Sequence, residues 1–511
     1  MSGEGRRVAT TGATFMKQED RRSILWLGGV IADPLAAELL RRGEITIVPT
    51  SPNNLSGLAP AARGIILEFA DDKDVFLDRI QRARDVGLDH GLRIALVRSD
   101  KSDEHVFASL VEAPDISREE LNRIRWYLPN VWPALAEWMA RESPGPGANP
   151  LLEIACDADT VLNDEQRLLL QRAFHRFDKL TVKELTGGFS GAKTYRICPT
   201  RTAPGAVQRL MPYLAKIGET ASIYKEVDNY NLYAAEHIPF NQRPNLNSDL
   251  IACGQSSAIL VEDFLHEARQ FSELWGVVGP GPVVASLFDG ALHGWRFNPL
   301  RRKSALAEQF KALRVLRYPD TLRDKGAARE EAALASKAYG STLSPHQLLE
   351  IIEKTPAINW CECAVHGDFH AENVFVRTAS SETYLIDFSN TASGPAVADP
   401  ASLEVSLTFR FPPKDRFDRD FVIKLYQYPL SVPAHDLRLP DRDRVWLWDA
   451  VRAIRRYVND EDSRAYVMAI ACYLLQAASY DNNDLERRAV AYYLAEKLMR
   501  ELHKDVGRAV A

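Results

Sequence analysis

The side chains best suited to chemistry lie in residues 365–388, which read VHGDFHAENVFVRTASSETYLIDF. This segment carries Asp368, Asn373 and Asp387, in that order. Phosphoryl transfer from a nucleotide needs a carboxylate that orients the acceptor hydroxyl, and it needs oxygen ligands that hold Mg²⁺ on the phosphates. Carboxylates and an amide are groups of these kinds, so the segment predicts a phosphoryl-transfer centre.

Two short apolar strands, at 373–376 and 384–388, are expected to position these groups. The loop before the first strand would then face the end of the second, which brings the three polar side chains together. The alternative is a plain hairpin in which Asp and Asn only close turns. A hairpin requires neither His366 and His370 nor the later Asp387, so we favour the chemical interpretation.

The spacing resembles the catalytic segment of the aminoglycoside phosphotransferase and choline kinase family. That family's loop runs H-G-D-x-H-x-x-N and its later strand ends in I-D-F or I-D-W, and every fixed position is met here. The resemblance implies a bilobal, protein-kinase-like α+β domain that uses ATP and Mg²⁺ and transfers phosphate to a hydroxyl. It also implies roles for five residues: catalytic base for Asp368, magnesium ligands for Asn373 and Asp387, and support of the loop for His366 and His370.

Residues 394–399, reading GPAVAD, resemble the family's segment that leads into the next helix. Asp399 would cap that helix and Pro400 would occupy its first turn, which makes a structural role for Asp399 the expectation.

Cys361 and Cys363 precede the two histidines and raise the alternative of a zinc site. Structural zinc usually uses C-x-x-C pairs, whereas C-x-C on an extended segment points both thiols to one side of a strand. We therefore expect buried thiols.

A glycine-rich turn precedes this segment in residues 185–197, LTGGFSGAKTYRI. Gly187, Gly188 and Gly191 would let backbone amides approach phosphate oxygens, and Ser190 would add a hydroxyl. Taken alone, the hairpin is equally well explained as a β-turn. The family carries a similar G-G-F-S turn at this place, so the resemblance implies nucleotide binding.

Lys216 lies in the apolar segment 213–218, where an unpaired ammonium would be costly to bury. ATP phosphates and a carboxylate would supply its partners. The helix-like run that follows offers Glu226 and its rival Glu236. We favour Glu226 because its interval to Pro239 resembles that of the family. The alternative is that Lys216 is an exposed lysine of an edge strand.

Residues 259–264, ILVEDF, resemble the strand that enters the hinge between the two lobes. The backbone of Val261, Glu262 and Asp263 would hydrogen-bond adenine, so side-chain identity there says little.

Composition agrees with a globular chain that has more than one domain. The chain has 511 residues, of which 46% are hydrophobic and 26% are charged. The net charge of −6 and the absence of a basic block disfavour nucleic-acid binding. Six scattered cysteines fit free thiols in a reducing cytoplasm. No membrane contact is expected, because residues 1–22 form a polar, flexible terminus without an apolar core and the apolar run 466–480 is too short to span a bilayer.

A proline- and glycine-rich linker at 142–150, ESPGPGANP, separates a small domain at 23–141 from the rest. The small domain alternates apolar runs with helical stretches, which predicts an α/β doubly wound parallel sheet. The expected strands are 23–27, 44–48, 64–69 and 93–97, and the helices include 34–42 and 74–86.

Length and strand order in this domain resemble response-regulator receivers, but the motifs depart from that family. Gly28 and Gly29 stand where a receiver has an acidic pair, and Glu68 follows the third strand with Asp71 and Asp72 beyond it. We expect a degenerate receiver-like domain that senses a ligand or binds a protein partner.

The phosphotransferase-like domain is expected at 151–511, with a mostly helical lead-in at 151–177. The N-lobe would cover about 178–263 and the C-lobe about 264–511, with a helical insert before His366 and helices from 441 onward. The stripe Trp446, Trp448, Val451, Ile454 and Tyr457 would pack the lobe.

The acceptor cannot be assigned from these helices. The basic run 301–303 is an anion-binding hint, with an exposed helix start or loop as the favoured alternative. Asp415, Asp418 and Asp420 could form an acidic pocket for a cationic acceptor, although a solvated charged face is the stronger interpretation.

These observations predict an ATP- and Mg²⁺-dependent phosphotransferase that acts on a hydroxyl of a small molecule or protein. The second hypothesis is a nucleotide-binding regulatory module without turnover, resembling the kinase-like ternary-complex-associated domains of bacterial conflict systems. Intact Asp368, Asn373 and Asp387 favour turnover, because a module that only binds has no need of a base.

Overall fold

The structure is a computed structural model that describes most of the chain. The described residues are 23–43, 45–59, 62–68, 73–89, 92–97, 124–127, 131–140, 146–185, 192–203, 206–254, 256–265, 267–316, 323–410, 417–427, 442–458, 462–480 and 483–510. Two compact units emerge: Met1–Tyr224 with Leu246–Phe264, and Lys225–Asn245 with Leu265–Ala511. The terminus predicted to be flexible, residues 1–22, lies outside the described residues.

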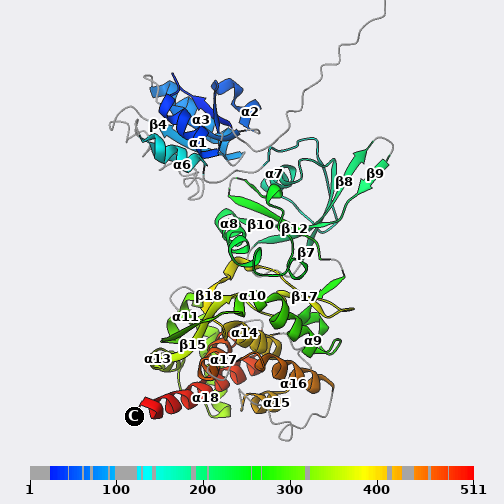
Figure 1. The fold of residues 1–511 in the computed structure, drawn as a ribbon, viewed down its shortest axis with the longest axis vertical. Helices are drawn as coiled ribbons and strands as arrows, with labels where there is room; N and C mark the ends of the chain where they lie inside the picture. Colours follow the sequence, from blue (N-terminus) through cyan, green and yellow to red (C-terminus); the bar gives the residue numbers. More distant parts are fainter. Residues whose placement is uncertain are drawn as a thin grey trace, which may run out of the picture. The chain divides into compact units, whose positions relative to one another are not determined.

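The first sheet of unit 1 has five parallel strands in the order β2-β1-β3-β4-β5. This is a doubly wound order, and it confirms the predicted fold class of the N-terminal domain. The strands are β1 (Ser23–Leu27), β2 (Thr46–Pro49), β3 (Ala62–Glu68), β4 (Arg93–Val97) and β5 (Ile124–Tyr127), and the helices are α1 (Asp33–Gly43), α2 (Leu55–Leu58), α3 (Lys73–Asp89) and α6 (Trp132–Ala140) (Figure 1).

Alternate residues of β1 enter different cores because successive strand side chains point to opposite faces. Leu25 and Leu27 pack with Phe76 of α3, whereas Ile24 and Trp26 pack in a cluster with residues of α1 and α6. Helices therefore cover both faces of the sheet, as a parallel sheet requires.

The second sheet of unit 1 runs β11-β12-β10-β8-β7-β6, with β9 paired to β8. Its pairs are antiparallel except β6 with β7. Its strands are β6 (Glu153–Cys156), β7 (Lys179–Leu185), β8 (Lys193–Ala203), β9 (Ala206–Arg209), β10 (Tyr213–Glu219), β11 (Ala252–Cys253) and β12 (Ser257–Asp263), and its helix is α7 (Asp164–Ala173).

The lead-in 151–177 is less helical than predicted. Strand β6 occupies part of it, because Ile154 and Cys156 pack against the same core as Leu180 of β7. The helix α7 begins at a capping box, in which Asn163 and Gln166 satisfy each other's backbone N–H groups.

Unit 2 contains two three-stranded sheets, β13-β16-β17 and β14-β15-β18. The strands are β13 (Ala268–Gln270), β14 (Leu300–Ser304), β15 (Ile358–Val365), β16 (Val374–Arg377), β17 (Glu382–Leu385) and β18 (Ala392–Pro395).

Helices make up most of the remainder of unit 2. They are α9 (Pro280–Ala285), α10 (His293–Arg296), α11 (Leu306–Ala312), α12 (Arg323–Ala335), α13 (Pro345–Lys354), α14 (Ala398–Val405), α15 (Arg419–Leu425), α16 (Arg442–Arg455), α17 (Ser463–Ala477) and α18 (Leu485–Val510). The helix α8 (Thr220–Asn229) continues as a π-helical turn, Tyr230–Ala234. The parallel sheet, followed by sheets and helices of α+β type, confirms the predicted fold class at the level of elements.

The C-terminal helices form a buried core, as predicted for the stripe on α16. Trp446, Trp448, Val451 and Ile454 are buried, and α18 packs along α17. No helix of the described residues is long and apolar enough to cross a membrane.

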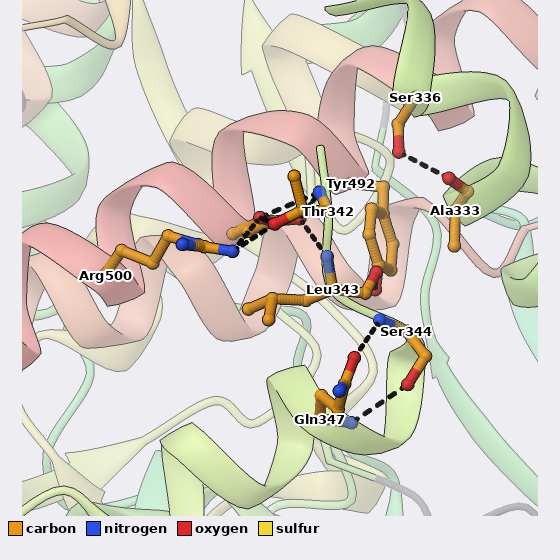
Figure 2. A network of polar contacts seen from close by, with 9 residues as sticks. Ala333, Ser336, Thr342, Leu343, Ser344, Gln347, Tyr492 and Arg500 are labelled. Carbon is orange, nitrogen blue, oxygen red and sulfur yellow. Dashed lines mark hydrogen bonds and ion pairs between the residues drawn. The ribbon is translucent and has the colours of Figure 1, made fainter. Parts of the chain in front are cut away.

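A polar network ties the segment before α13 to α18 (Figure 2). The buried Glu496 carboxylate accepts from the backbone N–H groups of Thr342 (3.1 Å) and Leu343 (3.2 Å) and pairs with Arg500 (2.9 Å). Ser344 and Gln347 close a capping box at the start of α13. This network gives hydrogen-bond partners to the backbone groups of the segment before α13 and to the buried Glu496 carboxylate.

Candidate active site

The loop 366–373 connects β15 to β16 within unit 2, and β16 pairs antiparallel with β17. The N–H of Ile386 continues the pairing by donating to the carbonyl of Asn373 (3.2 Å). Asp387 follows immediately, so it leaves the strand beside the loop that carries Asp368. The predicted strands 373–376 and 384–388 are therefore present with shifted ends, because β17 stops at Leu385 and Asp387 adopts a turn conformation.

His366 is the buried anchor of the loop. Its backbone N–H donates to both carboxylate oxygens of Asp399 (3.1 and 3.0 Å), and its Nε2–H donates to the carbonyl of Ile386 (2.9 Å). The histidine thus joins the start of the loop to the end of β17, which agrees with the expected supporting role.

Asp399 does not cap α14, contrary to the prediction. The residue before the helix is Val397, with no side-chain cap, and Asp399 lies in the first turn together with Pro400. Its carboxylate faces the loop because it accepts the N–H groups of His366 and Gly367. Burial raises the pKa of Asp399 against the opposing charge of His366.

Asn373 is buried and closes the loop. Its Nδ2 donates to the carbonyl of Asp368 (2.9 Å), and its backbone N–H donates to the carbonyl of His370 (2.9 Å). Because the amide nitrogen is used in this way, Oδ1 is the side-chain atom suited to a metal, and oxygen is the ligand that Mg²⁺ prefers.

The Asp368 side chain is 49% exposed and lies 3.7 Å from Nε2 of His370, measured from Oδ2. Burial by itself raises the pKa of Asp368, but the nearby His370 and the charge of His366 together outweigh it, and the pKa is lowered overall. The carboxylate is therefore anionic at neutral pH and reachable from solvent, as a group that receives a hydroxyl proton must be.

Asp387 has a left-handed backbone conformation, with φ of 63°. Asp adopts this region more readily than most residues, yet a non-glycine residue held there costs about 1–3 kcal/mol. The Oγ–H of Ser389 donates to its Oδ1 (2.7 Å), and the N–H of Ser389 lies 3.4 Å from the same oxygen. Sequence reasoning missed Ser389, although its place directly after the I-D-F triplet was a usable signal.

Gly367 is required by the packing of the loop. Its φ is 77°, and a Cβ atom there would lie 2.2 Å from the carbonyl oxygen of Asn390. The loop and the turn after Asp387 therefore approach each other closely. The glycine of the sequence motif did not by itself indicate this contact.

The site is suited to magnesium in its donor chemistry. Among the described residues, no group of three or more His, Cys, Asp or Glu side chains is placed to hold a metal ion. Asp387 and Asn373 carry oxygen atoms, the ligand type that Mg²⁺ prefers, and Mg²⁺ commonly takes further ligands from water and phosphates; their role as ligands stays a prediction. The residues thus fit a magnesium–nucleotide complex better than a metal held by protein alone.

Unit 1 carries the predicted phosphate-binding lysine in the middle of a sheet. Lys216 lies on β10 opposite Leu260 of β12 and Thr194 of β8. The alternative of an edge-strand lysine is therefore wrong, because neighbouring strands pair with both sides of β10. The glycine-rich turn predicted to cover the phosphates, with Gly187, Gly188, Ser190 and Gly191, lies outside the described residues.

The predicted adenine-binding segment forms the end of β12. Asn247 donates its backbone N–H to the carbonyl of Val261 (2.9 Å) and its Nδ2 to Oδ1 of Asp263 (3.1 Å). Glu262 is buried and Asp263 is exposed. The carbonyl oxygen of Val261 thus already accepts one hydrogen bond within the protein. Adenine binding by the backbone of this segment stays a prediction.

Glu226 and Glu236 differ in their environment within unit 2. Glu226 lies on α8 and is buried, whereas Glu236 lies beyond the helix and is exposed. Burial of a carboxylate demands a charged or hydrogen-bonding partner, which favours Glu226 over its rival. The pairing of Glu226 with Lys216 stays a prediction.

Cys361 and Cys363 are buried on β15, as expected for thiols on one side of a strand. Burial raises the pKa of the Cys363 thiol to about 12. Burial of both thiols on one strand fits the expected packing role.

Some of the charged residues considered for binding of the acceptor make ion pairs within the protein. The basic run 301–303 is neither a helix start nor a loop but part of β14, an exposed edge strand on which Arg302 pairs with Glu362 (2.6 Å). Asp418 caps α15 and pairs with Arg444, and the exposed Asp420 pairs with Arg419 (3.0 Å). Asp415 lies outside the described residues.

The N-terminal domain keeps one acidic residue at the carboxyl edge of its sheet. Oε2 of Glu68, at the end of β3, accepts the N–H of Gly29 (2.8 Å). A Cβ on Gly28 would lie 2.5 Å from Cβ of Glu68, so the glycine makes room for this contact. Glu68 therefore links the C-terminal ends of the neighbouring strands β1 and β3. Asp71 and Asp72 lie outside the described residues.

Known proteins share parts of this chain. The family model described as ternary complex associated domain 9 matches residues 291–480, less than half of the chain but including the loop of Asp368 and the turn of Asp387. This match confirms the expected similarity to ternary-complex-associated domains for that segment. No curated protein matches the chain.

Two solved structures are similar at low identity. An aminoglycoside-3'-phosphotransferase of type VIII is 17% identical, with 57% of this chain and 100% of that chain covered and a TM-score of 0.29. A Plasmodium vivax ethanolamine kinase is 11% identical, with 68% and 93% covered and a TM-score of 0.34. Both scores are below 0.5, so the fold class above is taken from the strand order and the helices of this chain.

Proposed function

We propose that the chain is an ATP- and Mg²⁺-dependent phosphotransferase that transfers the γ-phosphoryl group to a hydroxyl. The observation that carries this proposal is the half-exposed, anionic Asp368, placed on a buttressed loop whose other end, Asn373, pairs with the residue preceding Asp387. A loop that served only as a turn would have no need of a reachable carboxylate held by a buried histidine.

Each residue of the loop has a separate task in this proposal. Asp368 accepts the proton of the acceptor hydroxyl and orients its oxygen, and His370 keeps that carboxylate anionic. Asn373 Oδ1 and the Asp387 carboxylate present oxygens to magnesium, which when bound would neutralise charge on the phosphates. Lys216, with Glu226 as its partner, would stabilise charge on the transferring group.

The experiment that tests the site needs no acceptor. Wild type and Asp387→Ala are titrated calorimetrically with ATP, each with and without magnesium. We expect magnesium to strengthen binding to the wild type and to have little effect on the variant, because one metal ligand is gone. Asp420→Ala, which removes an exposed aspartate of the same unit, should behave as wild type. Absence of ATP binding to the wild type would contradict the proposal.

A second function is a nucleotide-binding regulatory module that reports ATP to a protein partner without turnover. The match to ternary complex associated domain 9 favours it, because that name describes an associated domain and not an activity. The N-terminal parallel-sheet domain would then bind the partner. The two functions differ in turnover, since a regulatory module binds magnesium and ATP without releasing ADP.

A further inference from the structure

The last residue of α8 reaches the turn that follows Asp387. Nδ2 of Asn229 donates to two successive carbonyl oxygens, those of Phe388 (3.0 Å) and Ser389 (3.0 Å). A primary amide has two N–H bonds, so one side chain satisfies both acceptors. All of these residues belong to unit 2.

The turn to which Asn229 donates its hydrogen bonds is the one that directly follows Asp387. Immediately before it, the carbonyl of Ile386 accepts the Nε2–H of His366, and within it Ser389 donates to the Asp387 carboxylate. On its far side the carbonyl of Asn390 lies against Gly367. The strained backbone of Asp387 is thus held from the catalytic segment on one side and from α8 on the other.

An aromatic contact accompanies the hydrogen bonds of Asn229. Tyr230, the residue after Asn229, meets Phe388 edge-on with ring centroids 5.7 Å apart. This contact is apolar and positions the helix beside the turn, but it exerts no direct hold on the backbone carbonyls. The amide of Asn229 links the helix to the two peptide carbonyls that follow Asp387 in the turn, those of Phe388 and Ser389.

We propose that Asn229 is a positioning residue of the magnesium centre, holding the left-handed turn at Asp387 through the Phe388 and Ser389 carbonyls. The inference rests on the proposed function, because it concerns the same metal ligand. Loss of the amide leaves two carbonyls without this donor, and the turn then relaxes away from a left-handed conformation that is unfavourable for a non-glycine residue. Since Glu226 lies on the same helix, α8 would join the proposed lysine partner to the metal ligand.

Two variants of the full chain separate the hydrogen bonds from side-chain bulk. Asn229→Ala removes the whole amide, and Asn229→Asp keeps the shape but replaces both N–H donors with acceptor oxygen. Asn241→Ala is the matched control, because Asn241 is an exposed asparagine of the same unit whose amide bonds Glu382 instead.

The first measurement is hydrogen–deuterium exchange of the apo protein. The backbone amides of a peptide covering residues 386–391 should exchange faster than in the wild type in both Asn229 variants. In the control variant their exchange should equal that of the wild type. The second is a calorimetric magnesium titration at saturating ATP, in which the apparent magnesium affinity should fall about ten- to a hundredfold, as for supporting residues of metal ligands in general. ATP binding without magnesium should stay at the wild-type value, which a merely unfolded variant would not show.

The outcomes distinguish this inference from the function on which it rests. Wild-type exchange, or wild-type magnesium affinity, in both Asn229 variants overturns the positioning role while leaving the proposed function intact. Absence of magnesium-dependent ATP binding in the wild type overturns the proposed function and this inference together.

Discussion

At the scale of single residues, the proposed chemistry depends on the charge state of Asp368. Its neighbours keep the carboxylate ionised while leaving half of its surface open. A base that is anionic but reachable can accept a proton from an incoming hydroxyl, whereas a fully buried one could not meet the acceptor.

Asp368→Asn should therefore separate binding from turnover. The amide preserves shape but cannot accept the hydroxyl proton, so turnover should fall by about 10²-fold or more while magnesium-dependent ATP affinity stays near the wild-type value. Steady-state kinetics and calorimetry on the same preparations provide the check. Equal turnover in the two proteins would refute the assignment of Asp368 as the base.

His370 should control the pH at which the base becomes protonated. The folded pKa of Asp368 is below its ordinary value of 3.8, so its ionised form favours the folded state above that value and the benefit is lost as pH falls through the lowered pKa. In His370→Asn the effect of burial and the charge of His366 remain while the lowering effect of His370 is gone, and the pKa of Asp368 should rise. The acid limb of the kcat/KM profile should move to higher pH; an unmoved limb would contradict this prediction.

At the scale of elements, the site depends on the close approach of two turns. The loop after β15 and the turn after β17 meet where Gly367 faces the carbonyl of Asn390. No side chain fits between them, so the distance between the two aspartate-bearing segments is set by backbone contact. Asp399, in the first turn of α14, accepts the backbone N–H of His366 and so fixes the start of the same loop.

Gly367→Ala should destabilise the protein more than the same change at Gly340. Both glycines have positive φ, 77° and 99°, so both substitutions bring backbone strain of about 1–3 kcal/mol. A Cβ at Gly340 meets nothing within 4 Å, whereas at Gly367 it meets a backbone oxygen. Urea denaturation should show the larger loss for Gly367→Ala, and equal losses would argue against a tight contact between the turns.

At the scale of the whole molecule, the proposed nucleotide residues are divided between two compact units. Lys216 and the β12 segment belong to unit 1, and the loop of Asp368 belongs to unit 2. The N-terminal sheet forms a further domain, in which Glu68 at the end of β3 accepts the N–H of Gly29 after the neighbouring strand β1. The regulatory alternative would require this domain to bind a partner.

A transfer screen with the full chain should identify the class of acceptor. With radiolabelled γ-phosphate on ATP, label should pass to one of the added small alcohols or candidate proteins in the wild type and not in Asp368→Asn. Magnesium-dependent ATP binding without labelled product or ADP release would instead support the regulatory module. The screen thus separates the two proposed functions, which share every binding residue.

The sequence by itself determined the local features. Residue types and spacing indicated the loop of His366, Asp368, His370 and Asn373, since these residues are neighbours along the chain. Short continuous apolar runs predicted β1 and β4 at their observed bounds. The tertiary structure decided which distant groups meet: Asp399 with the loop, Lys216 inside a sheet, and Asn229 with Phe388, 159 residues away. Motif spacing records covalent neighbours, whereas hydrogen-bond partners and left-handed turns are selected by packing between segments that the chain separates, and no local pattern carries that information.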